Sequence, residues 1–140
     1  MRYLLDTNSW IHYLKFPKSP IRSRLEALAP TDIAVCSVVK AELFHGAEKY
    51  GNRERRLAIV TETIAPYISL PFDDHSAVEY GLIRHQLERA GSVIGPNDLM
   101  IAAIVRANDL TLVTHNTDEF MRVEGLRVED WLTEGTGVGR

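Results

Sequence analysis

Short apolar runs recur along the chain at intervals that suit the strands of one sheet. They cover residues 3–5, 33–36, 68–70, 110–113 and 126–128, and polar or turn-forming residues bound each run. Continuous apolar runs, without polar residues in alternation, are typical of strands that are covered on both faces, as in parallel sheets. The pattern therefore predicts a buried sheet of four to five strands.

Between these runs, apolar residues recur three or four positions apart, which is the spacing of one helix face. The expected helices cover 8–16, a short segment from 20, 38–50, 52–64 with Asn52 as its cap, 73–90 and 97–107. The last of them is apolar on almost every side from Leu99 to Val105, which predicts that it is buried. Strands that alternate with helices predict an α/β fold, in which a central parallel sheet carries helices on both faces.

Acidic and amide side chains follow several of these strands. Because the carboxyl ends of parallel strands share one edge of a sheet, we expect such side chains to converge there. Carboxylates that lie together repel one another and lose hydration, and a hard cation such as Mg²⁺ removes that cost. The pattern predicts a metal site at this edge, and the residues in position for it are Asp6, Glu42, Asp98, Asn116, Asp118 and Glu119.

Each acid also has an ordinary structural explanation. Asp6 is placed to cap the first helix, and Asp98 is placed to complement the dipole of the helix that it begins. Glu42 could lie on a solvated helix face, and Asp118 and Glu119 could be plain loop acids. One shared edge explains all of these positions together, so we favour the cluster.

Composition and motifs argue against several other kinds of functional site. No cysteine partners the five histidines at a spacing for zinc, and there is neither a Walker phosphate loop nor a GxGxxG motif. The single cysteine, Cys36, lies in an apolar run. It has no partner for a disulfide within the chain, which suits a reducing compartment. We find no transmembrane run and no signal peptide, so we expect a cytoplasmic protein without membrane contact. Residues 1–133 are expected to form one domain, followed by a flexible tail at 134–140.

Charge is distributed unevenly, although the net charge is only −3. Residues 1–60 hold 10 basic and 6 acidic residues, whereas residues 61–140 hold 6 and 13. A phosphate-bearing ligand would be attracted to the first half, and solvated helix faces explain the same pattern. The helix over 8–16 is unusually apolar, which indicates either core packing or a groove for a partner.

Four ordered motifs resemble the PIN domain and, within it, the VapC toxins. They are LLDTN at 4–8, SVVKAEL at 37–43, GPNDLMIA at 95–102 and THNTDEF at 114–120. The segments at 123–126 and 128–131 also resemble the end of that family. The resemblance covers nearly the whole chain and implies a compact PIN-like α/β nuclease domain over residues 1–133.

The resemblance also implies a site. Asp6, Glu42 and Asp98 match the acidic triad of the family and would bind Mg²⁺, with Mn²⁺ as a substitute. Glu119 matches a fourth acidic position, and Asn116 would face the site. The resemblance leaves open whether one or two metal ions bind, and what Asp118 does.

The implied activity is endonucleolytic cleavage of RNA by the toxin of a type II toxin–antitoxin pair, which inhibits translation and growth. A cognate VapB-like antitoxin would neutralise it in a hetero-oligomer, and operator DNA would be bound only through that antitoxin. The resemblance further implies a homodimer. Similar toxins of enteric bacteria cut initiator tRNA in the anticodon loop, so tRNA is the expected substrate. The RNA site and the identity and stoichiometry of the antitoxin stay open.

Two functions from other classes remain. A phosphatase or phospho-receiver could use Asp6 as its nucleophile, but haloacid-type phosphatases carry a second Asp two residues later, where this chain has Asn8. A DNA-binding co-repressor acting through its antitoxin would not depend on Asp6.

Overall fold

The computed structural model describes residues 1–133 and 136–139. Its strands are β1 (Tyr3–Leu5), β2 (Ile33–Cys36), β3 (Ile68–Leu70), β4 (Thr111–Val113), β5 (Arg127–Glu129) and β6 (Thr136–Val138). Its helices are α1 (Thr7–Lys15), α2 (Pro20–Glu26), α3 (Ser37–Lys49), α4 (Arg53–Ile64), α5 (Asp74–Ala90), α6 (Pro96–Ala107) and α7 (Thr117–Phe120), with a 3₁₀ turn at Pro30–Asp32. The expected α/β architecture is confirmed.

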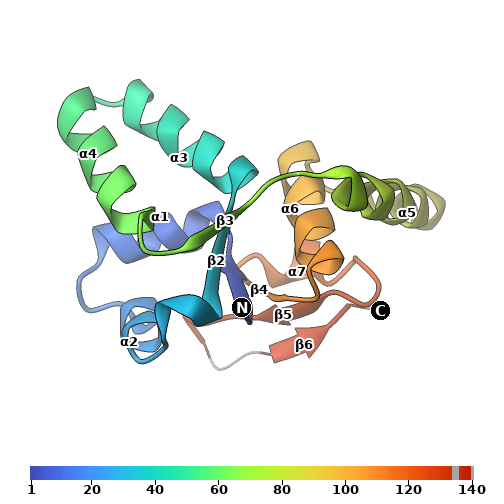
Figure 1. The fold of residues 1–140 in the computed structure, drawn as a ribbon. Helices are drawn as coiled ribbons and strands as arrows, with labels where there is room; N and C mark the ends of the chain where they lie inside the picture. Colours follow the sequence, from blue (N-terminus) through green and yellow to red (C-terminus); the bar gives the residue numbers. More distant parts are fainter. Residues whose placement is uncertain (134–135, 140) are drawn as a thin grey trace.

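The sheet has the strand order β3-β2-β1-β4-β5-β6, in which β1 to β5 are parallel (Figure 1). The antiparallel β6 was not predicted, since it lies in the segment expected to be flexible. Residues 134, 135 and 140 of that segment lie outside the described residues. The five predicted strands are therefore present, and a sixth extends the sheet.

The connections place α1 to α4 on one face of the sheet and α5 to α7 on the other (Figure 1). Right-handed crossovers produce this division, because the chain moves outward from β1 in one direction and then from β4 in the other. The strand order reverses between β1 and β4. In open parallel sheets, ligands bind at such a reversal, beyond the carboxyl ends of the strands.

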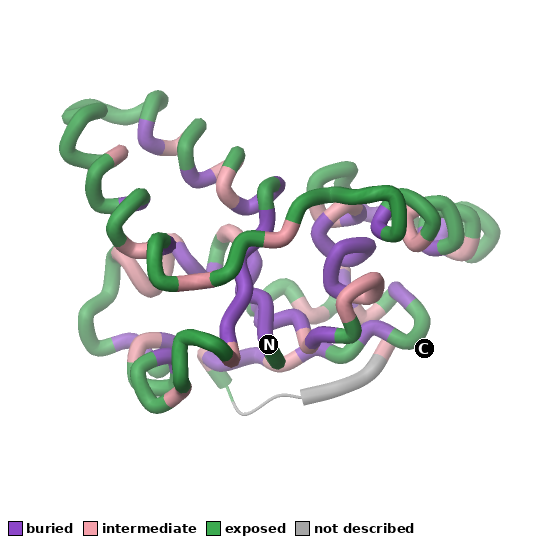
Figure 2. Tube along the Cα trace, in the orientation of Figure 1, coloured by how far each residue is buried: buried purple, intermediate pink, exposed green. Residues whose placement is uncertain are grey.

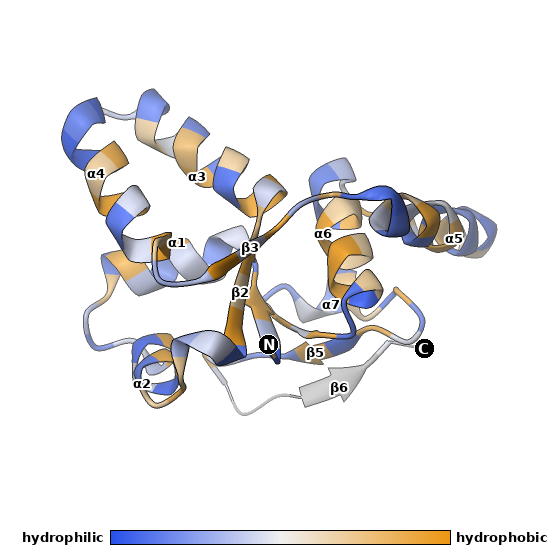
Figure 3. Cartoon of the chain, in the orientation of Figure 1, coloured by the Kyte–Doolittle hydropathy of each residue, from blue (hydrophilic) through white to orange (hydrophobic). Residues whose placement is uncertain are grey.

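Burial follows the sheet and α6. Every residue of β2 is inaccessible to solvent, as are Leu4 and Leu5 of β1 (Figure 2). The segment Ile101–Val105 of α6 is likewise fully buried, as its apolar sequence predicts. Hydrophobic residues are concentrated on the sheet and on this helix (Figure 3). The buried sheet and α6 form a rigid base for the side chains at the strand ends.

The apolar residues of α1 (Thr7–Lys15) lie partly in the core and partly in a surface groove. Trp10 is completely buried and packs edge-on against Tyr13, whereas Ile11 and Leu14 line a surface groove. At α4, Asn52 occupies the N-cap position as expected, but it has a left-handed φ of 61° and its side chain makes no capping bond. None of the helices in the described ranges is long and apolar enough to span a membrane.

Candidate active site

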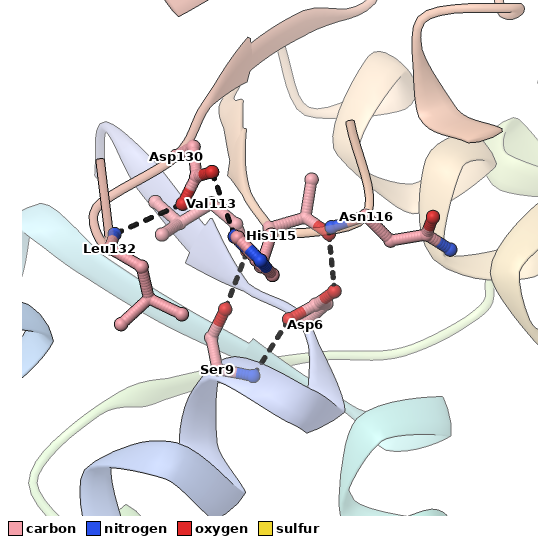
Figure 4. Close-up of polar contacts among 8 residues, drawn as sticks. Asp6, Ser9, Val113, His115, Asn116, Asp130 and Leu132 are labelled. Carbon is pink, nitrogen blue, oxygen red and sulfur yellow. Dashed lines mark hydrogen bonds and ion pairs between the residues drawn. The ribbon is translucent and has the colours of Figure 1, made fainter. Parts of the chain in front are cut away.

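Asp6 follows β1 directly and is almost completely buried, at 5% exposure. Its Oδ1 accepts a hydrogen bond from the backbone N–H of Ser9 at 2.9 Å, which caps α1, and its Oδ2 accepts one from the Thr114 hydroxyl at 2.6 Å (Figure 4). Burial raises the pKa of Asp6 despite these bonds, and the charge of Glu42 raises it further. Asp6 is thus both a helix cap and a member of a charged cluster.

Thr114 connects the ends of β1 and β4. It is fully buried, and its hydroxyl accepts the Asn116 backbone N–H at 3.0 Å while it donates to Asp6. The sequence analysis did not identify Thr114 as a site residue. Its place at the start of THNTDEF, one residue beyond a buried strand, was the available signal.

Glu42 reaches the same edge from α3. It lies near the start of that helix, one turn beyond the end of β2, and its Oε1 accepts a hydrogen bond from the Thr7 hydroxyl at 2.6 Å. Thr7 follows Asp6 in the chain, so this bond ties Glu42 to the first acid. Thr7 is a second residue that the sequence analysis did not identify.

Asp98 lies in the first turn of α6 and has the clearest electrostatic signature. Burial, then the charge and hydrogen bond of Glu119, and then the charges of Asp6 and Glu42 raise its pKa from 3.8 to about 7. Glu119, Asp6 and Glu42 therefore lie close enough to Asp98 to interact with it electrostatically. A hard divalent cation would relieve this repulsion.

Glu119 is held in place from two sides. Its Oε1 accepts the Gly95 backbone N–H at 3.0 Å, and its Oε2 accepts a hydrogen bond from the Asn116 side chain. A Cβ on Gly95 would lie 3.8 Å from Asp98 Oδ2 and 3.9 Å from Glu119 Oε1, so both oxygens face the same turn. The structure thus brings Glu119 and Asn116 to Asp98, whereas Asp118 is exposed on α7.

The donor set fits a divalent cation with retained waters. Among residues 1–133 and 136–139, no three Asp, Glu, His or Cys side chains are arranged to hold a metal ion as they stand. A small hard cation, however, binds through one or two carboxylates and completes its coordination with water and substrate phosphate. Burial and the charges of Glu119, Asp6 and Glu42 all raise the pKa of Asp98, and a bound cation would oppose each of these effects.

Comparisons with known proteins agree with this geometry. The family model for the PIN domain matches residues 3–126. The tRNA(fMet)-specific endonuclease VapC of Shigella flexneri is 40% identical over 131 residues, which cover 94% of this chain and 98% of that protein. Ribonuclease VapC2 of Haemophilus influenzae strain Rd is 37% identical, with coverage of 94% and 99%.

Solved structures give the same result. A chain of the DNA-bound VapBC complex of Salmonella typhimurium superposes with a TM-score of 0.87 at 38% identity, and the match covers 94% of this chain and 98% of that chain. PIN-domain nucleases depend on a divalent metal ion, which the cluster of four carboxylates suits. The chain belongs to the PIN domain family and, within that family, to the VapC ribonucleases.

Proposed function

We propose that this protein is a Mg²⁺-dependent endoribonuclease that serves as the toxin of a type II toxin–antitoxin pair. The observation that carries the proposal is the convergence of Asp6, Glu42 and Glu119 on the half-buried Asp98: burial first, and then these three residues, raise the pKa of Asp98 to about 7. Side chains of these four residues come from both faces of the sheet and meet where the strand order reverses. The nuclease domain would comprise residues 1–133.

In the proposed mechanism, Asp6 and Asp98 hold the cation and Glu42 orients the attacking water. Bound Mg²⁺ would supply an activated water and neutralise charge on the scissile phosphate. Ser9 and Thr114 fix both oxygens of Asp6, and Gly95 and Asn116 fix Glu119 beside Asp98. Asp98 would hold the cation in its ionised form, because carboxylate ligands must be deprotonated. No side-chain nucleophile is needed, which separates this mechanism from that of a phosphatase using Asp6.

We propose tRNA as the substrate, with the anticodon loop of initiator tRNA as the site of cleavage. The support is the name of the Shigella flexneri relative, which is specific for tRNA(fMet). An unpaired loop can bring its backbone to acids recessed at a strand edge, whereas a duplex presents a stiff surface.

The inhibitor is proposed to be a VapB-like antitoxin that lies in the groove between α1, α3 and α4. This groove has a volume of about 290 Å³ and is mostly apolar, but Glu42 of the cluster also lines it, so it leads to the site. An antitoxin segment could bury apolar side chains there and place an Arg or Lys among the carboxylates in place of the cation. The groove residues are Ile11, Leu14, Lys15, Glu42, Leu43, Gly46, Ala47, Tyr50, Arg56, Ile59 and Val60.

Two basic residues of the neighbouring α2 have contacts within the protein. Arg22 donates to the backbone carbonyl of Tyr13 at 2.7 Å, and Arg24 pairs with Glu129 at 3.1 Å. Lys15 does line the groove. The basic residues that line the groove are therefore Lys15 and Arg56, and Arg56 also donates through Nε to the Gly51 carbonyl at 2.7 Å.

Assembly follows from the complexes of the relatives. Solved neighbours are VapBC complexes, one of them bound to DNA. We propose that this chain is a homodimer that joins its antitoxin in a hetero-oligomer, reaches operator DNA only through it, and works in the cytoplasm. The co-repressor role is compatible with cleavage.

Cleavage is tested with labelled initiator tRNA and an elongator tRNA in Mg²⁺, with mapping of the new RNA ends. Asp98→Asn and Asp6→Asn should each lower kcat by about 100-fold or more, because each removes a charge that holds the cation. Asp74→Asn is the matched control, since Asp74 is also in the first turn of a helix but is exposed on α5. Wild-type cleavage by Asp98→Asn protein would contradict the proposed site.

A further inference from the structure

A histidine–carboxylate pair lies beside the cluster, at the ends of the next two strands. His115 Nδ1 is 2.9 Å from Asp130 Oδ2, and the other oxygen of Asp130 accepts the Leu132 backbone N–H at 3.0 Å (Figure 4). Register places this pair at the same edge as Asp6, because Leu5 lies opposite Val113 and Val113 lies opposite Glu129. The mechanism above uses neither residue of the pair.

Asp130 remains ionised in this position. Burial opposes its charge, but hydrogen bonds from His115, Leu132 and Thr133 outweigh that effect and hold the pKa of Asp130 below its usual value. A buried carboxylate that faces an imidazole holds a proton on the facing nitrogen and fixes the orientation of the ring. The Nδ1 of His115 is thereby committed to Asp130, and its Nε2 is left for another partner.

The ring is open to solvent and next to the acids. The side chain of His115 is 64% exposed, whereas that of Asp130 is 7% exposed. In the chain, His115 stands between Thr114, which holds Asp6, and Asn116, which holds Glu119. The imidazole therefore lies at the same edge of the sheet as the acids.

An RNA strand needs positive partners at this edge. Four carboxylates exceed the charge of one divalent cation, and the phosphates beside the scissile one bring further negative charge. Several arginines are already paired with acids: Arg24 with Glu129, Arg106 with Glu79 and Arg127 with Asp109. Within residues 1–133 and 136–139, the hydrogen bond of His115 is made by Nδ1, so Nε2–H is available to a phosphate.

We propose that His115 binds a backbone phosphate of the RNA next to the scissile bond through Nε2–H, and that Asp130 is the residue that positions it. The proposal rests on the ribonuclease function above. It adds a substrate contact that lies outside the acidic cluster and that acts on binding rather than on the chemical step.

The test compares steady-state cleavage of one labelled tRNA by wild type, His115→Ala, His115→Lys and Asp130→Asn. His115→Ala should raise KM roughly tenfold and leave kcat within about twofold, as expected for losing one charge-assisted hydrogen bond. The dependence of log KM on log salt should become shallower by about 0.7 for a contact to a single strand. His115→Lys should restore the salt dependence, and Asp130→Asn should change KM in the same direction as His115→Ala.

His85→Ala serves as the matched control, because His85 is also exposed but lies on α5. An unchanged KM and salt dependence in His115→Ala protein would overturn the proposal, as would an equal change in His85→Ala protein. A loss confined to kcat would overturn it too, since it would place His115 in the chemical step. Failure of the wild type to cleave RNA would instead refute the proposed function.

Discussion

Two aspartates show how far the surroundings of a residue decide its role. Asp6 and Asp73 occupy the same local motif, since each caps a helix by accepting the backbone N–H of a serine three residues later, at 2.9 Å. Burial raises the pKa of Asp6, whereas hydrogen bonds from Ser76 lower the pKa of Asp73, which is exposed. The cap motif is therefore common to both residues, and burial together with the nearby charge of Glu42 distinguishes Asp6.

The raised pKa of Asp98 predicts a pH dependence of stability. In the metal-free protein the folded state keeps the proton of Asp98 up to about pH 7, while the unfolded chain releases it near 3.8. The folded state binds more protons in this window, so the free energy of unfolding should fall as the pH rises from about 4 to about 7. Solvent screening of this partly exposed group reduces the expected loss to about 1–2 kcal/mol.

Thermal unfolding in EDTA across this pH range checks the prediction, with Asp98→Asn protein beside the wild type. The difference in Tm between the two should change steadily in favour of Asp98→Asn as the pH rises. Parallel curves would mean that Asp98 titrates normally.

At the level of single residues, the positions of the acids could be predicted from the sequence, whereas the groups that hydrogen-bond to them could not. Asp6, Asp98 and Glu42 follow strands or begin helices, so topology places them without knowledge of side-chain packing. Thr7, Thr114 and the Gly95 backbone N–H were not predicted, because their contribution depends on contacts between segments far apart in the chain. A single threonine forms no repeating pattern in the sequence, so no periodicity marks its hydroxyl as the partner of an acid.

At the level of elements, patterns longer than one turn were reliable. The long helices and the five parallel strands match the expected ranges closely, because the helices repeat their apolar spacing and most of the strands form buried runs. The edge strand β3 is the exception, since Ile68 and Ser69 are exposed. Short elements were missed: α7 has four residues, and β6 has a Gly- and Thr-rich sequence without hydrophobic alternation. The groove between α1, α3 and α4 also depends on how these helices pack, which periodicity does not specify.

That groove gives a prediction about its occupant. Gly46 of α3 lines the groove, and a Cβ there would meet no atom within 4 Å. Gly46→Leu should therefore fill the groove without straining the helix and weaken antitoxin binding by tenfold or more, while RNA cleavage stays near the wild-type rate. Titration calorimetry with the antitoxin, together with the tRNA assay, measures both effects.

Gly81→Leu is the control, since Gly81 of α5 also has open space at its Cβ but lies outside the groove. Undiminished antitoxin affinity in Gly46→Leu protein would show that inhibition acts at another surface.

At the scale of the whole molecule, cation binding and folding should be linked. Asp6→Asn keeps a cap and removes a desolvated charge, so in EDTA it should be as stable as the wild type or about 1 kcal/mol more stable. Mg²⁺ should raise the Tm of the wild type, since it binds only the folded site; a hundredfold excess over Kd contributes about 2.7 kcal/mol. Asp6→Asn protein should gain much less.

Asp73→Asn protein separates this effect from the loss of a cap charge. Because Asp73 lies outside the cluster, this variant should be no more stable than the wild type in EDTA and should respond to Mg²⁺ as the wild type does. Identical behaviour of the two variants would contradict a cation site at Asp6.

The acids of the site belong to four separate parts of the chain: the end of β1, α3, α6 and α7. The exposed turn between α5 and α6 divides them into two pairs, with Asp6 and Glu42 before it and Asp98 and Glu119 after it. A chain that is still being synthesised, or one cut at this turn and separated, therefore holds half of the donor set. For a protein harmful to the cell that makes it, toxicity is thereby delayed until nearly the whole chain has been translated and folded.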